Sequence, residues 1–256
     1  MTPDATPPIV IATTLAFFRI GGLMVIAPMF SARTIPRMVR AALAVLLTVL
    51  LVPALPPVPP TMIIGPAELG AELIVGLGIG FGAAAMIGGA ELAGDVLAVQ
   101  TGLSGGTALD PLTGQGTGVL GQLLGLFVLL LLLVTDGHLA LIEALAASYT
   151  IVPVGWSFDL VGGVLELART MGLLFSQGLQ FAAPIIASVT VGYMALGVLA
   201  RTSPQLNMLA VAFPLQIGLG LLVLGASLPL AASFYSAWPM HVRELSSRFL
   251  VAVIGG

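Results

Sequence analysis

Three of the eight basic residues in this 256-residue chain lie within ten positions, in the stretch Ser31-Ala-Arg-Thr-Ile-Pro-Arg-Met-Val-Arg40. Apolar sequence flanks this stretch on both sides. Arginine clusters in such places are typical of loops that stay on the cytoplasmic side while their flanks enter a bilayer. The composition agrees, because 58% of the residues are hydrophobic and 7% are charged, against about 25% charged in a soluble domain. The sequence therefore predicts an all-α integral membrane protein.

Between its polar turns the chain reads as a series of apolar helices within one packed unit. Five to seven spans of about 20 residues fit its length. The apolar stretches lie at about 9–29, 38–55, 66–100, 118–135, 138–152, 160–200 and 205–236. As single helices, residues 66–100 and 160–200 would run about 50 and 60 Å, against a hydrocarbon core of roughly 30 Å. We expect these two stretches to kink, to fold back or to project beyond the lipid, with Pro184 and the glycines between Gly76 and Gly82 as bend points.

The residue types leave little material for catalysis. The chain has no cysteine, no lysine and two histidines, and its net charge is −3. Disulfides, thiolate metal sites and a phosphate-binding loop that needs lysine are therefore excluded, and neither histidine has the neighbours of a metal site. We expect no catalytic residue, no metal and no cofactor, and the charge gives no sign of a nucleic-acid surface.

A row of small residues recurs at every fourth position, at Gly76, Gly80, Ala84 and Gly88. This spacing aligns them on one face of a helix, and in lipid such a face lets two helix backbones approach closely. The pattern predicts a packing surface, either against another helix of the same chain or against another subunit.

A single arginine, Arg19, lies at the middle of the first apolar segment. An arginine at the bilayer centre costs at least about 2.5–3.5 kcal/mol, so its side chain should face protein, water or a carboxylate. We expect a buried charge set that contains Arg19, Glu91 and Asp95, with Glu68 and Glu72 as further candidate partners. A proton relay through these carboxylates is the alternative interpretation.

Two polar features interrupt the apolar sequence. Residues 102–118 form a loop rich in glycine, threonine and serine, which is consistent with an ordinary external loop or with a segment that lines an aqueous pore. The turns Ala32-Arg-Thr-Ile-Pro36 and Ala200-Arg-Thr-Ser-Pro204 resemble each other. They indicate either the same turn chemistry in two helical hairpins or a duplicated architecture with both turns in the cytoplasm.

Several short motifs, taken in order, resemble the FliR family of the bacterial flagellar type III export apparatus. The longest is Pro28-Met-Phe-Ser-Ala-Arg-Thr-Ile-Pro-Arg-Met-Val-Arg-Ala-Ala-Leu-Ala44. The others are Phe17-Phe-Arg19, Gly102-Leu-Ser104 with Asp110-Pro111, Asp136-Gly-His-Leu139, Pro153 with Gly155, Pro204-Gln-Leu-Asn207 and Phe213-Pro214. The resemblance covers nearly the whole chain, and it is the order of the motifs that makes it specific.

The resemblance implies a fold of kinked helical hairpins like a fusion of FliP and FliQ, with residues 1–158 FliP-like and 159–256 FliQ-like. It implies a structural and gating subunit of the flagellar export channel, placed in the inner membrane at the flagellar basal body. The implied partners are FliP-like and FliQ-like subunits, FlhB-like and FlhA-like proteins, membrane lipid and exported unfolded flagellar proteins.

The resemblance also assigns roles to residues. The loop corresponds to the family's plug, with Leu103, Ser104, Gly105, Gly106, Thr107, Ala108, Leu109, Asp110 and Pro111 as its residues. Where family members often carry bulky aromatic side chains, this chain has Gly105 and Ala108, so the position of the plug carries over but not its seal. The expected cytoplasmic turns contain Arg33, Pro36, Arg37, Arg40, Arg201, Pro204, Gln205 and Asn207, and residues 201–207 would lie near FlhB.

Two other functions remain open at this point. The equivalent subunit of a virulence-type type III secretion system belongs to the same class, although the motifs at Asp110 and Asp136 favour the flagellar system. A self-contained transporter of small solutes belongs to a different class, and it predicts transport by the purified chain alone.

Overall fold

The computed structural model describes residues 7–32, 35–59, 62, 64–102, 118–155, 159–202 and 208–255. All regular secondary structure within these ranges is helical. The helices are α1 (Pro8–Ile26), α2 (Pro28–Ser31), α3 (Arg37–Leu51), the 3-10 helix η1 (Val52–Ala54), α4 (Pro66–Gln100), α6 (Val119–Val134), α7 (Gly137–Ile151), α8 (Leu160–Thr202), α9 (Met208–Ser236) and α10 (Trp238–Ile254).

The helix boundaries follow from residues that cannot continue a helix. Ala27 adopts an extended conformation immediately before Pro28, as residues that precede proline tend to do, and α1 ends there. Pro36 precedes the first residue of α3. Asp136, between α6 and α7, has a left-handed backbone with φ of 57°, a conformation that aspartate tolerates better than most residues.

The prediction of an all-α membrane protein is confirmed. Among the described residues, five helices are long and apolar enough to cross a membrane, and the consecutive pair α6 and α7 would make a sixth span. The two long stretches, 66–100 and 160–200, do not fold back on themselves. Each forms a single helix, α4 with 35 residues and α8 with 43 residues. At about 1.5 Å per residue, both helices are much longer than a hydrocarbon core.

The chain divides into two compact units. The first comprises Met1–Ala85, Leu132–Gly172 and Trp238–Gly256, and the second comprises Met86–Leu131 and Leu173–Ala237. Each unit therefore contains residues from both the 1–158 and the 159–256 part of the chain. The proposed division into FliP-like and FliQ-like parts stays a prediction.

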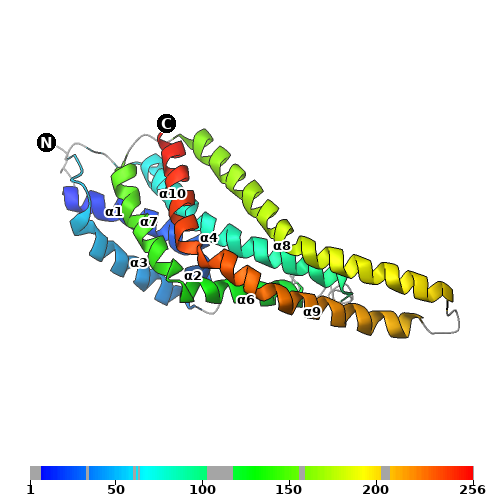
Figure 1. The fold of residues 1–256 in the computed structure, drawn as a ribbon. Coiled ribbons are helices and arrows are strands. Elements are labelled where there is room, and N and C mark those ends of the chain that lie inside the picture. The colour runs from blue at the N-terminus through cyan, green and yellow to red at the C-terminus, as the bar shows by residue number, and fades with distance from the viewer. Residues whose placement is uncertain are drawn as a thin grey trace. The chain divides into compact units, whose positions relative to one another are not determined.

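The first unit is built around α1, whose apolar residues Ile11, Leu15 and Ile20 are fully buried. Helix α3 pairs with α1, and α7 pairs with α10 (Figure 1). At the start of α7, a Cβ on Gly137 would lie 2.6 Å from Cδ1 of Trp238. Trp238 is completely buried, so it joins the beginnings of α7 and α10.

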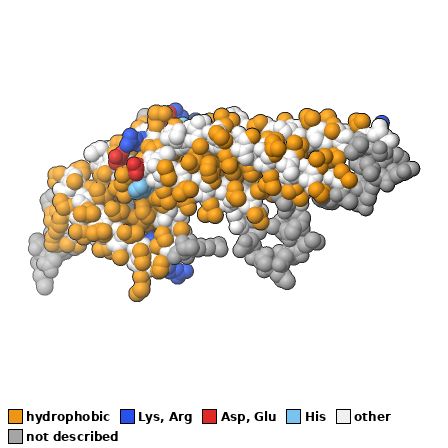
Figure 2. All heavy atoms as spheres, turned by 60° about the horizontal axis from the view of Figure 1, so that its bottom comes forward, with side chains coloured by type: hydrophobic (Ala, Val, Ile, Leu, Met, Phe, Trp, Pro, Cys, Tyr) orange, Lys and Arg blue, Asp and Glu red, His pale blue; other side chains and the backbone are white. Residues whose placement is uncertain are grey.

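In the second unit, α8 and α9 run side by side as a hairpin (Figure 1). Their backbones are close, because a Cβ on Gly192 would lie 2.7 Å from the side chain of Leu219. Most of the surface of α8 and α9 is exposed in the isolated chain, as is most of α3, whereas about half of α1 and α4 is buried. Figure 2 shows how widely hydrophobic side chains cover the face in view.

Candidate functional site: a buried arginine and the flanks of the glycine-rich loop

The polar centre of the first unit is Arg19, whose side chain has no solvent exposure. Its Nε donates to Oε2 of Glu72 at 2.6 Å, and Glu72 on α4 is also buried. Glu72 is therefore the partner that the structure selects from the four carboxylates offered by the sequence. Glu91 and Asp95 belong to the second unit and are only half-buried.

The other donors of Arg19 are also satisfied. One terminal nitrogen donates to Oγ of Ser148 and the other to the carbonyl of Val152, each at 3.0 Å. The guanidinium carbon lies 4.4 Å from the ring centroid of Tyr149, a cation–π geometry. The second carboxylate oxygen of Glu72 accepts from the backbone N–H of Gly155 at 3.1 Å. This network joins α1, α4, α7 and the turn after α7.

Small residues make this network possible by letting α1 and α4 approach. A Cβ on Gly76 would overlap the carbonyl oxygen of Arg19, and one on Gly22 would lie 2.9 Å from the backbone nitrogen of Leu77. A Cβ on Gly80 would lie 2.5 Å from the side chain of Ile26 and 3.2 Å from the backbone nitrogen of Ala27. With Arg19 and Glu72 in place, the cluster holds α1 and α4 in a fixed register.

The row of small residues changes its environment along α4. Gly76 and Gly80 are buried against α1 and Ala84 is half-buried, whereas Gly88 is exposed and a Cβ added to it would have no neighbour within 4 Å. Two other glycines of α4 face α10, because a Cβ on Gly78 would overlap the ring of Phe249 and one on Gly82 would lie 3.7 Å from Leu245. The row is therefore an internal packing face at its beginning only.

In the second unit, Asp95 and Glu91 of α4 lie against the first turns of α6. The Oδ1 of Asp95 accepts from the backbone N–H of Gly118 at 2.7 Å. A Cβ on Gly125 would lie 2.6 Å from Cγ of Glu91. The carboxylates thus reach α6 at positions where α6 has no side chain, a relation that the sequence alone did not indicate.

The residues expected in cytoplasmic turns lie partly outside the described ranges. Pro36 and Arg37 are exposed, and Arg40 is half-buried with its guanidinium 3.3 Å from the carbonyl oxygen of Ala32. Arg201 is exposed at the end of α8. Outside the described residues are Arg33, Pro204, Gln205 and Asn207, together with the whole expected plug from Leu103 to Pro111.

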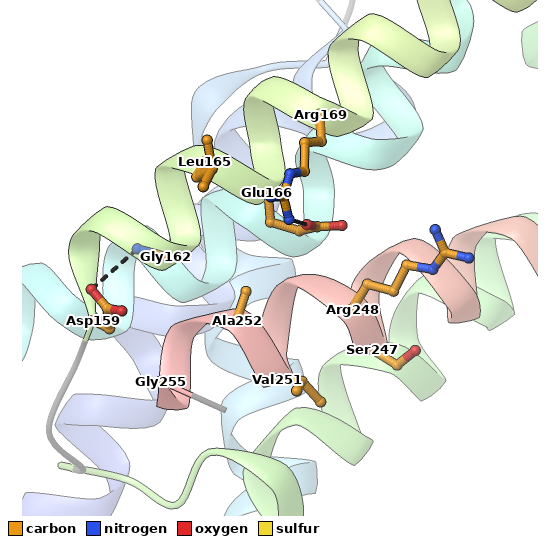
Figure 3. A pocket seen from close by; sticks show the side chains of 10 residues that line it. All are labelled: Asp159, Gly162, Leu165, Glu166, Arg169, Ser247, Arg248, Val251, Ala252 and Gly255. Carbon is orange, nitrogen blue, oxygen red and sulfur yellow. Dashed lines mark hydrogen bonds and ion pairs between the residues drawn. The ribbon is translucent and has the colours of Figure 1, made fainter.

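An open groove of about 620 Å³ lies between the start of α8 and α10 (Figure 3). Asp159 caps α8 by accepting from the backbone N–H of Gly162 at 3.1 Å. Arg169 pairs with Glu166 at 3.5 Å on the same helix, and Arg248 pairs with Glu244. These charges are matched within their own helices. Arg169, Glu244 and Arg248 are exposed and Glu166 is half-buried, and ion pairs in such open positions contribute little to stability.

Metal ligands do not gather anywhere in the described part of the chain, since no group of three histidine, aspartate or glutamate side chains has the required geometry there. Besides the buried pair of Arg19 and Glu72, the described residues form ion pairs near the surface and hydrogen bonds at helix ends.

Residues 10–239 match the family described as bacterial export proteins, family 1. The flagellar biosynthetic protein FliR of Pectobacterium carotovorum is 35% identical over 85% of this chain and 84% of its own length. FliR of Escherichia coli K12 is 31% identical over 84% of both chains. The secretion system apparatus protein SsaT of Salmonella typhimurium is 28% identical over 64% of both chains. The chain therefore belongs to the bacterial export proteins, family 1, and within them to the flagellar FliR proteins.

Proposed function

We propose that this chain is a structural and gating subunit of the flagellar export channel in the bacterial inner membrane. Its FliR membership makes it a membrane component of flagellar protein export. The finer proposal is that it assembles with FliP-like and FliQ-like subunits, contacts FlhB-like and FlhA-like proteins, and passes unfolded flagellar proteins. Its helices hold neighbouring subunits around a conduit, and the energy for export comes from other components.

The observation that carries this proposal is the exposed surface of the long helix α8. At 43 residues it is about 65 Å long, roughly twice the thickness of a hydrocarbon core. Its exposed residues include Phe175 and Val191 but also Gln180 and Thr190. Apolar surface beyond the lipid needs a protein partner, and the polar side chains can hydrogen-bond with one.

The gating part of the proposal concerns the loop of residues 103–117. By resemblance to the family, this loop closes the channel at rest, and the turn at residues 201–207 lies in the cytoplasm near an FlhB-like protein. The flanking helices α4 and α6 both contribute residues to the second unit. The division into a FliP-like part up to residue 158 and a FliQ-like part from 159 belongs to the same proposal.

The flagellar system is favoured over the virulence-type system. The FliR proteins of P. carotovorum and E. coli match more of the chain and at higher identity than SsaT does. The self-contained transporter has no comparable support, because it leaves the extensive exposed apolar surface of α8 and α9 without a protein partner.

Deletion of Gly105–Leu109 tests the gating role in cells that carry the complete set of export genes. We expect the export complex to assemble normally and the membrane to leak ions and small molecules. A second variant, Ala108→Phe, adds the bulky side chain that relatives often have and should leak no more than the unaltered chain. Normal assembly of the deletion variant with unchanged ion conductance would refute the plug assignment.

A further inference from the structure

The first turn of α6 is held by a carboxylate from another helix. Gly118 directly precedes this helix, and its carbonyl accepts from the N–H of Gln122 at 3.0 Å. Its own N–H donates to Oδ1 of Asp95 at 2.7 Å. The N-terminus of a helix presents N–H groups without partners and a partial positive charge, so an aspartate from α4 satisfies both requirements there.

The surface of α6 is shaped to receive this carboxylate. Gly118, Gly121 and Gly125 follow one another at spacings of three and four residues, which places them on one face of the helix. A Cβ on Gly121 would overlap the Asp95 carboxylate and lie 2.9 Å from the carbonyl oxygen of Glu91. Any larger residue at this position would therefore separate α6 from α4 and break the contact between Asp95 and Gly118.

The end of α4 is also held, by α8 and α9. The hydroxyl of Tyr193 on α8 donates to the carbonyl of Gln100. The next residue, Thr101, is only 1% exposed. A Cβ on Gly220 of α9 would overlap its methyl group. The chain is thus fixed in space at residues 100–101 and again at residue 118, all within the second unit.

We propose that Asp95 and Tyr193 are positioning residues that fix the two flanks of the segment between Gly102 and Gly118. Asp95 determines where α6 begins, and Tyr193 determines where α4 ends. Where it concerns conductance, this inference rests on the gating function proposed above for that segment. The geometry of the flanks themselves can be tested independently of gating.

Cross-linking tests the geometry, and the chain suits it because it has no native cysteine. A Cβ on Gly118 would lie 3.4 Å from Cβ of Ala98, close to the separation of about 3.5–4.5 Å in a disulfide. In membranes that contain the assembled complex, the pair Ala98→Cys with Gly118→Cys should cross-link rapidly on mild oxidation. The control pair Gly88→Cys with Gly118→Cys should not, since Gly88 faces open space.

Adding Asp95→Ala to the cross-linking pair should slow disulfide formation about tenfold or more, because a hydrogen bond to a charged group is lost. Asp95→Asn retains an acceptor oxygen and should restore most of the rate. Glu68 provides a matched control, since its carboxylate also accepts from a glycine N–H at a helix start, that of Gly65 at 2.8 Å in the first unit. Glu68→Ala should leave the rate unchanged. An unchanged rate with Asp95→Ala would overturn the proposal.

Ion conductance then separates this inference from the proposed function. We expect Asp95→Ala and Tyr193→Phe each to raise the resting leak, while Asp95→Asn and Glu68→Ala remain tight. If the deletion of Gly105–Leu109 leaks but Asp95→Ala does not, the positioning role is wrong and the gating role stands. If neither variant leaks, the gating role is wrong, and cross-linking alone decides whether Asp95 holds the start of α6.

Discussion

Replacement of Arg19 by methionine should destabilise the first unit strongly. The substitution removes the charge opposite Glu72 and the donors to Ser148 and Val152. Glu72 then remains buried with one hydrogen bond, from Gly155. Removing one partner of a buried ion pair typically costs about 3–5 kcal/mol. For a chain of this size such a loss lowers the unfolding midpoint by roughly 6–20 °C.

The assay is the thermal midpoint of the export complex purified in mild detergent, with the amount of chain in membranes as a second readout. The control is the double variant Arg19→Met with Glu72→Gln, in which a neutral amide keeps an acceptor for Gly155. Ser148 keeps its own bond to the carbonyl of Leu145, so the groups left without a partner are neutral ones: the carbonyl of Val152 and the new amide nitrogen at position 72. We expect the double variant to recover most of the lost stability.

Two results would refute this reasoning. One is a midpoint for Arg19→Met within about 2 °C of the unaltered chain, since that corresponds to less than about 1 kcal/mol. The other is a double variant as unstable as the single one, which would show that the uncompensated charge of Glu72 is not the cause of the loss.

Three other predictions concern different parts of the chain. Gly76→Leu should prevent accumulation of the chain in membranes, because its side chain would meet the backbone of Arg19. Gly88→Leu should leave the chain stable but reduce co-purification of partner subunits. If the two variants behave alike in membrane fractions and pull-downs, Gly76 and Gly88 do not face different neighbours. Replacing the arginines at positions 33, 37 and 40 with glutamate should disturb orientation in the membrane, and normal topology by cysteine labelling would argue otherwise. Asp136→Val should lower the thermal midpoint through about 1–2 kcal/mol of backbone strain at its φ of 57°, while Asp136→Gly should not, and identical midpoints would contradict the strain.

Much of the fold could be predicted from the sequence because membrane helices are encoded locally. Prolines and polar turns marked the ends of α1, α3 and α4 to within a few residues. The predicted apolar stretches ended at residue 236 and so missed α10. Arg243, Glu244 and Arg248 interrupt its apolar character, but its buried residues Trp238, Val242, Phe249 and Val253 follow helical spacing. Periodicity would have found this helix where hydropathy did not.

The candidate sites were less predictable because they depend on contacts between distant segments. The physics of a buried arginine required a partner, but four carboxylates were available. Only the register of α1 against α4, set by Gly22 and Gly76, selects Glu72. The role of Asp95 at the start of α6 was likewise not predicted from the sequence. Gly118, Gly121 and Gly125 do not recur at every fourth position as the small residues of α4 do, so they did not indicate a packing face.

The central claim is that these helices hold sister subunits around a protein-conducting channel. The most direct measurement is purification of the tagged chain from native membranes in mild detergent, with mass spectrometry of the co-purifying proteins. We predict FliP-like and FliQ-like subunits in a stable complex, and no solute transport by the chain alone in vesicles. A monodisperse monomer that transports small solutes unaided would contradict the account.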